Sequence, residues 1–344
     1  MTTARRASLA IAVTTACGCL GPHGVSKPAN EPWRYEVVVP SAGTTIWVRG
    51  TGSGDGQRAL AWDARTRPGD PVIAVGLAPG SRAMDDGDVA EWVATSATVV
   101  SRYLGGWPVD RALVFVSPGE AGKIDGETLD DRGGTIFLRV GCDVSLGAAS
   151  KDWVLVHEMI HLVLPGLGPP HQWLEEGIAT YVEPIARARA GVISDASVWS
   201  EWLASMPQGL PEAADEGLDR THTWARTYWG GAIYCLAADI EIRRSTRNQR
   251  SLDDALRAIS RGSSGVAEHW PIERLIATGD AATGVHVLRA LYGRLALAPG
   301  TVDLAATWRD LGVSRSGESV AFDDGAPLAY VRRAITHPEG AKGG

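Results

Sequence analysis

Residues 154–164 have the sequence Val154-Leu155-Val156-His157-Glu158-Met159-Ile160-His161-Leu162-Val163-Leu164. A helix built from them is apolar on nearly every face, and such a helix is buried. His157 and His161 stand four residues apart, so one helical face carries both imidazoles with Glu158 beside them. Buried histidines and carboxylates need polar partners, and the H-E-x-x-H spacing is typical of a metal site. The segment predicts a buried helix over Lys151–Leu164 that contributes two metal ligands.

A second helix is expected after a short turn. Pro165 ends the first helix, Gly166–Pro170 forms the turn, and the next helix spans His171–Ala186. Antiparallel helices joined by a short turn bring a side chain of the second back toward the first. A catalytic zinc ion usually has three protein ligands and an open fourth position. Glu175 and Glu176 are therefore both candidates for the third ligand.

These two helices resemble the gluzincin, or peptidase MA-like, zinc metallopeptidases, which include thermolysin-like enzymes and the M1 and M61 aminopeptidases. The resemblance is carried by the H-E-x-x-H helix and by Trp173-Leu174-Glu175-Glu176-Gly177-Ile178-Ala179, which is similar to the family's W-L-x-E-G-x-A segment. There the glutamate before the glycine binds zinc, which implies Glu176 as the third ligand beside His157 and His161. The interval between His161 and Glu176 is shorter than in the M1 pattern and fits the looser group of bacterial peptidase-MA-like proteins better.

The resemblance implies a zinc-dependent peptidase that acts on a peptide or protein substrate. Zinc in such a site activates a water molecule, and Glu158 is expected to accept the proton of that water as general base and to pass it to the leaving amine. Tyr228 and Gly231 resemble the Y-x-x-G segment that carries a tyrosine stabilising the transition state, which implies that role for Tyr228. Tyr234 and Tyr181 are the alternatives.

Three further features are expected to lie near the metal site, and these are Glu183, His171 and the strand Gly134–Val140. Thr180 and Glu183 lie on the helical face of Glu176, so Glu183 is expected either to orient a histidine ligand or to be a surface charge. His171 is a less favoured ligand that would cap the helix or line the mouth of the site. The strand Gly134–Val140 lies where the resemblance places the sheet edge that pairs with substrate.

The family's aminopeptidases carry a G-x-M-E-N element near that strand. Here Thr135-Ile136 replaces its Met-Glu pair. This difference weakens the case for an aminopeptidase and leaves an endopeptidase or a narrow exopeptidase open.

Apolar patterns predict an α+β fold, because strands come first and helices follow. The expected strands are Tyr35–Val39 and Thr45–Arg49, with a turn at Gly50–Gly56, then Pro71–Gly76, Arg111–Ser117 and Gly134–Val140, with a helix at Asp88–Leu104 among them. Further helices are expected at Trp224–Arg244, Leu252–Ile259, Ile272–Ala277, Val285–Leu297 and Ala326–Ile335. The resemblance implies one thermolysin-like domain over about residues 30–340, with a sheet-bearing lobe to about residue 165 and a helical lobe from about 166.

Composition supports a packed globular domain and excludes several classes of protein. Of 344 residues, 44% are hydrophobic and 21% are charged, as in ordinary folded domains. The net charge is −7 and no basic stripe is present, so a nucleic acid is not an expected partner. The 13 tryptophans are expected to be large core residues.

Residues 1–24 have the pattern of a secretory signal peptide. Arg5 and Arg6 precede a short apolar run, and a small residue stands before Cys17. The protein is therefore expected to be extracytoplasmic, as a secreted, periplasmic or cell-surface protein, with a lipid anchor on Cys17 or Cys19 as the one possible membrane attachment. In an oxidising compartment, Cys142 and Cys235 are expected either to form a disulfide with each other or to remain buried as unpaired thiols.

Two other functions remain open from the sequence. The first is a non-catalytic cell-envelope protein with a structural zinc, in which His171 would be a fourth ligand and Tyr228 would point into the core. The second is a zinc hydrolase whose substrate is not a peptide.

Overall fold

The computed structural model describes residues 35–41, 44–53, 71–130, 134–317 and 319–337. It mixes helices and strands, which confirms the coarse part of the predicted fold class. The predicted signal peptide, with Cys17 and Cys19, lies outside the described residues, and the predicted lobe boundaries stay a prediction. Among the described helices, none has both the length and the apolar character needed to cross a bilayer.

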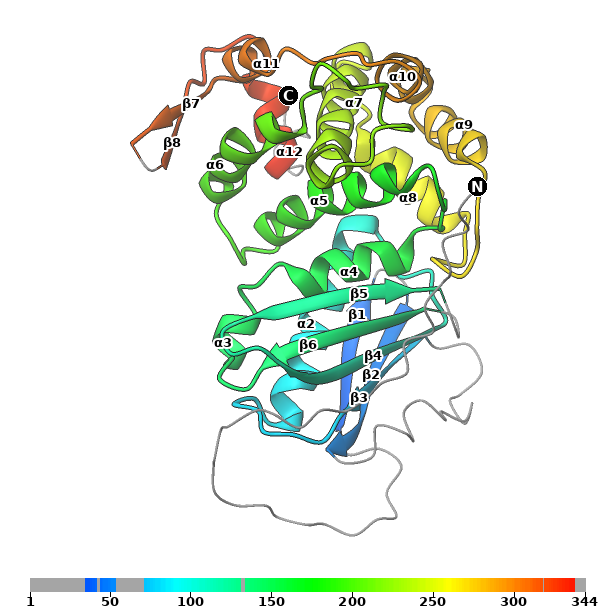
Figure 1. Cartoon of the computed structure of the whole chain (residues 1–344), viewed down its shortest axis with the longest axis vertical. Coiled ribbons are helices and arrows are strands. Elements are labelled where there is room, and N and C mark those ends of the chain that lie inside the picture. Colours follow the sequence, from blue (N-terminus) through cyan, green and yellow to red (C-terminus); the bar gives the residue numbers. More distant parts are fainter. Residues whose placement is uncertain (1–34, 42–43, 54–70, 131–133, 318, 338–344) are drawn as a thin grey trace.

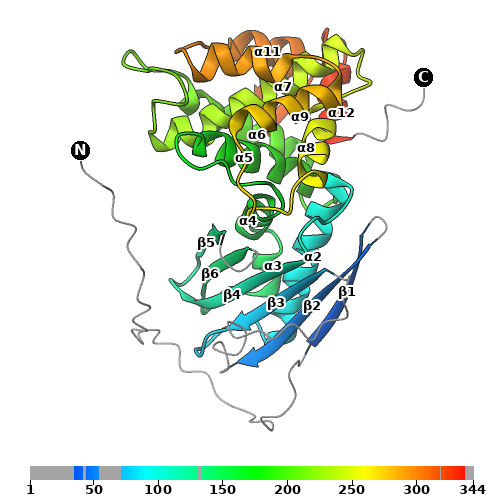
Figure 2. The same ribbon diagram turned by 90° about the vertical axis from the view of Figure 1, so that its right-hand side faces the viewer.

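Six strands form the main sheet, in the order β1 (Tyr35–Ser41), β2 (Thr44–Ser53), β3 (Val72–Leu77), β4 (Arg111–Gly119), β6 (Thr135–Gly141) and β5 (Ile124–Leu129). Strands β2, β3, β4 and β6 are parallel, whereas β1 and β5 pair antiparallel at the two ends. The long helix α2 (Asp86–Leu104) packs against the sheet (Figure 2). Strand β3 is buried along its whole length, as expected for a parallel strand in the middle of a sheet.

The start and the edge of this sheet differ from the sequence prediction. Strand β2 continues to Ser53 instead of turning at Gly50, because Gly50 pairs with Tyr35 of β1 and Ser53 pairs with Leu77 of β3. Strand β5 was not predicted, since its sequence Ile-Asp-Gly-Glu-Thr-Leu contains two apolar residues and a glycine.

The assignment of Gly134–Val140 as the sheet edge was wrong. Strand β6 is hydrogen-bonded on both sides, to β4 and to β5, so its backbone has no free edge. In the described sheet, β5 is the outer strand at this end. Its polar composition follows from that position, because an edge strand keeps one face and one edge near solvent.

Helices follow the sheet, as the sequence predicts. The hairpin with the predicted metal ligands consists of α4 (Val154–Val163) and α5 (Gln172–Arg189), and α4 lies between the sheet and the helices from α5 onward (Figures 1 and 2). The other described elements are α3 (Leu146–Ala149), α6 (Asp195–Ser205), η2 (Met206–Gly209), η3 (Arg226–Gly230), α7 (Gly231–Ser245), α8 (Leu252–Arg261), α9 (Ile272–Thr283), α10 (Val287–Leu291), η4 (Tyr292–Ala296), α11 (Leu304–Leu311), β7 (Val313–Ser316), β8 (Ser319–Phe322) and α12 (Ala329–Thr336).

Helices α6 and α11 and the hairpin β7–β8 were not predicted. Helix α6 is short and serine-rich, which lowers its intrinsic helix propensity. It is stabilised by tertiary packing instead, because Val198, Trp199 and Trp202 are completely buried.

Cys235 is a free, buried thiol on α7. Cys142 does not pair with Cys235, and because Cys142 is itself disulfide-bonded, both alternatives from the sequence were wrong. Burial raises the pKa of the Cys235 thiol above its ordinary value, and the nearby Asp239 carboxylate adds to the effect. This thiol is accordingly unreactive at neutral pH.

Candidate functional site

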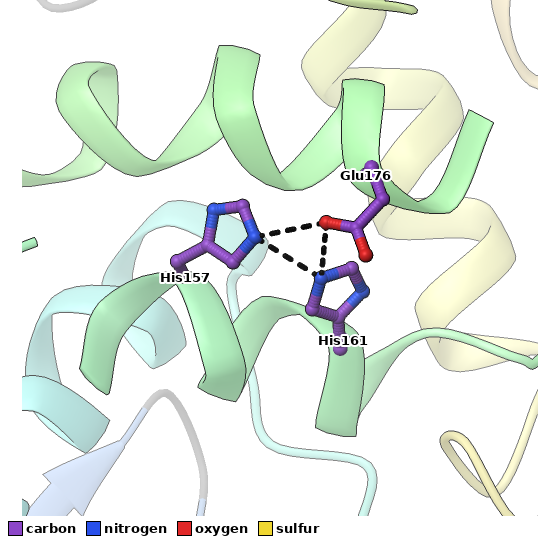
Figure 3. Close-up of side chains that lie close together, drawn as sticks. All are labelled: His157, His161 and Glu176. Carbon is purple, nitrogen blue, oxygen red and sulfur yellow. Dashed lines mark hydrogen bonds and ion pairs between the residues drawn. The ribbon is translucent and has the colours of Figure 1, made fainter. Parts of the chain in front are cut away.

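The hairpin α4–α5 brings His157, His161 and Glu176 together (Figure 3). Glu176 Oε2 lies 3.2 Å from His157 Nε2 and 3.3 Å from His161 Nε2. The two imidazole nitrogens are 3.2 Å apart. Ligand atoms that surround one zinc ion tetrahedrally at about 2.0–2.2 Å are separated by roughly 3.3–3.6 Å. The three separations lie at or just below the short end of this range, and imidazole and carboxylate are ligands that zinc takes. Within the described part of the chain the group has three members.

The charges of these three side chains favour a cation between them. Burial alone would raise the pKa of Glu176, but the two imidazoles lower it well below its usual range. Burial opposes charge on His161, yet Glu176 beside it raises the pKa of His161 to about 9. Burial lowers the pKa of His157, whose side chain is the more enclosed of the two. The site therefore attracts positive charge to the point where a metal ion would bind.

Two glycines bring Tyr228 next to these ligands. A Cβ atom on Gly177 would lie 2.4 Å from the backbone of Gly231, and one on Gly231 would lie 2.1 Å from the carbonyl oxygen of Trp173. Helix α5 and the η3–α7 helix therefore touch backbone to backbone directly beside Glu176. Tyr228 belongs to η3, a π-helical turn, and such turns are frequent at functional sites. Its ring stacks on His157, with ring centroids 6.2 Å apart.

Glu158 is held by the unpredicted strand β5. The hydroxyl of Thr128 lies 2.7 Å from Glu158 Oε2 and 3.0 Å from the Glu158 carbonyl oxygen. Gly126 allows this close approach, because a Cβ atom there would lie 2.8 Å from Glu158 Cγ and 2.7 Å from Val154 Cγ1. The edge strand thus fixes the carboxylate that stands beside the candidate metal ligands.

A cleft of about 590 Å³ opens in front of these groups. Strand β5, the turn after α4, the start of α5 and Tyr228 line it. The lining of the cleft is mainly acidic, with one arginine, Arg139. Its acidic side chains are Glu127, Asp130, Glu158, Glu175 and Glu176. The turn after α4 is tied down from two sides, since Leu167 N–H donates to Glu175 Oε1 at 2.5 Å and Gly166 exchanges backbone hydrogen bonds with Glu268 and Trp270.

Glu175, the rival for the third ligand, is thus engaged with the backbone of this turn. The group of three side chains that could hold a metal ion contains Glu176 in its place. The two neighbouring glutamates point in different directions because successive helical residues are separated by about 100° around the axis.

His171 stands at the N-cap position of α5, but its side chain neither caps the helix nor lines the cleft. Its Nδ1 atom lies 3.1 Å from Asp219 Oδ1, and its side chain makes no helix-capping bond. Trp173 Nε1 donates to the same Asp219 oxygen at 2.7 Å. Because Asp219 holds His171 at the start of α5, the histidine does not join the three candidate ligands.

Both predictions for Glu183 were wrong, because it neither contacts a histidine ligand nor lies on the surface. It is 5% exposed and accepts a hydrogen bond from Arg187 Nη1 at 2.5 Å. Burial raises the pKa of Glu183 to about 8, against the effect of Arg187. Since Arg187 also donates to the carbonyl of Lys151, this pair ties α5 to the segment before α4. The hydroxyl of Thr180 is buried without a hydrogen-bond partner among the described residues.

The two alternative tyrosines are core residues. Tyr181 donates to Asp239 Oδ2 at 2.9 Å, and Tyr234 donates to the carbonyl of Leu288 at 2.8 Å. Neither lines the cleft, whereas Tyr228 does.

Sequence reasoning missed Thr128 and Gly126. The one local signal for them is the alternation of Ile124, Gly126 and Thr128 on one side of β5. This pattern is too short and too polar to predict a strand from the sequence. Their role depends on the contact with Glu158, thirty residues later in the chain.

No protein-family model matches the chain, and no curated protein matches it. Among solved structures, it is similar to an M1 zinc metallopeptidase from Deinococcus radiodurans, with 18% identity and a TM-score of 0.44, over 75% of this chain and 49% of that one. It is also similar to an aminopeptidase N family protein from Idiomarina loihiensis, with 12% identity and a TM-score of 0.49, over 81% of this chain and 49% of that one. The chain spans about half the length of these two proteins. Zinc metallopeptidases of the M1 family are thus among the solved structures to which the chain is similar.

Proposed function

We propose that this protein is a zinc-dependent peptidase of the gluzincin type. The observation that carries the proposal is the group of His157, His161 and Glu176, whose donor atoms have nearly the spacing of zinc ligands. Glu158 and Tyr228 line the same cleft as two of these ligands. A set of three ligands with a glutamate and a tyrosine beside it suits peptide hydrolysis, because such a site leaves one coordination position for water or substrate.

Each side chain then has a chemical task. Zinc, when bound, supplies Lewis-acid activation of water and of the substrate carbonyl. Glu158, with its carboxylate held by Thr128, accepts the proton of the attacking water and passes it to the leaving amine. Tyr228 donates a hydrogen bond to the oxygen that gains negative charge. Burial and the nearby Glu176 raise the pKa of Tyr228, so its hydroxyl keeps the proton that it donates.

The free edge of β5 offers a place for the substrate backbone. Strand β5 lines the cleft from Gly126 to Leu129, and an extended peptide can add to such an edge through main-chain hydrogen bonds. We place substrate pairing on β5, in place of β6. Export of the protein, from the signal pattern in residues 1–24, remains part of this proposal.

Removal of the metal is expected to abolish the activity reversibly. Purified zinc-loaded protein, incubated with a mixed peptide library, should produce cleavage products that mass spectrometry detects. A chelator should stop the cleavage, and stoichiometric zinc should restore it, because the fully folded ligand set rebinds the ion. A protein that binds stoichiometric zinc and cleaves no peptide would favour the structural-zinc alternative.

Thr128 is expected to position the general base. Thr128→Val keeps the shape of the side chain and removes the hydroxyl that contacts Glu158. We expect kcat to fall about ten- to hundredfold, since a misplaced catalytic group costs that much, with KM and bound zinc nearly unchanged.

Thr128→Ser is the matched control for this effect, because it restores the hydroxyl. It should recover most of the lost kcat. If the serine variant is as slow as the valine variant, Thr128 acts through packing alone.

A further inference from the structure

Two tryptophans depart from the general pattern of this protein. Of the ten whose side chains the structure describes, eight are at most 8% exposed, and these are Trp92, Trp107, Trp173, Trp199, Trp202, Trp229, Trp270 and Trp308. Trp153 is 47% exposed and Trp224 is 62% exposed. Water around an exposed indole is displaced favourably by an apolar partner, and tryptophan is enriched at the centres of binding surfaces.

Both exposed tryptophans contact the candidate active site. The ring of Trp153 lies edge-on to His157 with a centroid distance of 5.1 Å, and the ring of Trp224 stacks on Tyr228 at 5.3 Å. Tyr228 in turn stacks on His157. Each tryptophan precedes its aromatic neighbour by four residues, which is one helical turn. We call the four rings Trp153, His157, Tyr228 and Trp224 the aromatic strip.

The aromatic strip extends beyond the acidic cleft. The cleft is lined by His161 and Glu176, and it does not include His157 or either exposed tryptophan. Tyr228 belongs to both surfaces. Tyr228 therefore joins the acidic cleft to the aromatic strip, so a peptide bound in the cleft beside Tyr228 lies next to the strip.

The two surfaces differ in chemistry as well as in place. The cleft presents several carboxylates and one arginine, whereas the exposed part of the strip is made of two indole rings. Packing alone does not require these rings, because about half or more of each side chain remains in solvent. Their location at the one described group of candidate metal ligands points to a bound partner.

We propose that the aromatic strip binds a large apolar side chain of the substrate, next to the peptide bond that is cleaved. The proposal rests on the function proposed above and names its substrate class, which is peptides with an aromatic or long aliphatic residue at that position. Aromatic pairs with offset or edge-on geometry gain energy beyond burial alone, so phenylalanine should be preferred over alanine.

The test compares paired peptides that differ in one residue, phenylalanine or alanine, at either side of the cleaved bond. The parent should cleave the phenylalanine peptide with about tenfold or higher kcat/KM, a typical discrimination for a difference in apolar size. Trp224→Ala and Trp153→Ala should each reduce this ratio toward one, because each lowers kcat/KM for the phenylalanine peptide more than for the alanine peptide. Tyr330→Ala is the control, because Tyr330 is an exposed aromatic residue of α12 and should leave the ratio unchanged.

A second arm does not depend on catalysis. Zinc-loaded Glu158→Gln protein, with and without Trp224→Ala, is titrated calorimetrically with the same two peptides. The phenylalanine peptide should bind about tenfold more tightly than the alanine peptide when Trp224 is present, and equally when it is absent.

The two arms separate the inference from the proposed function. If the parent cleaves peptides but shows no preference, or if the preference survives both tryptophan substitutions, the inference is overturned and the peptidase function stands. If the parent cleaves nothing, the binding arm decides, and equal binding of the two peptides overturns the inference.

Discussion

Glu158→Gln is expected to lower kcat by about 10²–10⁴-fold, the range by which general acid–base groups accelerate reactions. Glutamine has nearly the same shape, and it can still accept the hydrogen bond from Thr128. It cannot accept a proton from water at neutral pH, so the step assigned to Glu158 is lost. The measurement is the steady-state cleavage of a peptide found in the library digest.

Zinc content is the control for this variant. Glu158 is not one of the three candidate ligands, so the glutamine variant should bind zinc as tightly as the parent in a competition titration. His161→Ala should lose both zinc and activity. Activity of Glu158→Gln near the parental rate would exclude the proposed mechanism, whatever the zinc content.

Gly231→Ala is expected to destabilise the fold strongly. Its new methyl group would meet the Trp173 carbonyl oxygen at 2.1 Å and the Cα atom of Gly177 at 2.6 Å, and backbone atoms cannot move aside as a flexible side chain can. We expect a loss of about 3 kcal/mol in the free energy of unfolding, at the upper end of the usual range for overpacking. Chemical denaturation monitored by tryptophan fluorescence measures this loss.

The same substitution should also harm the site, because it separates the helix with Tyr228 from the helix with Glu176. Folded Gly231→Ala protein should therefore keep zinc but lose kcat by about tenfold or more, as expected when a catalytic group is displaced. Gly293→Ala is the matched control. Gly293 is an exposed helical residue with no atom within 4 Å of a new Cβ, so this change should leave stability equal or about 0.5–1 kcal/mol higher. Equal effects of the two substitutions would contradict the role given to the Gly177–Gly231 contact.

The amino-acid pattern was enough to predict the helix with His157, Glu158 and His161. Helical spacing is a local property, so the two histidines four residues apart share a face in any fold that keeps the helix. The following turn and the resemblance to a known zinc-binding segment then pointed to Glu176, which the structure brings within 3.3 Å of both imidazoles. Tyr228 was found through a similar local pattern.

The strand at the sheet edge and the residue that holds Glu158 could not be predicted, because both depend on packing between distant segments. Strand β5 has little apolar pattern of its own, and its place depends on pairing with β6 and packing against α4. The partners of Glu183 and His171, and the exposure of Trp153 and Trp224, likewise depend on segments far away in the chain. The physical reason is that a side chain's burial and contacts are set by whatever packs against it, and local periodicity reports only the face on which it lies.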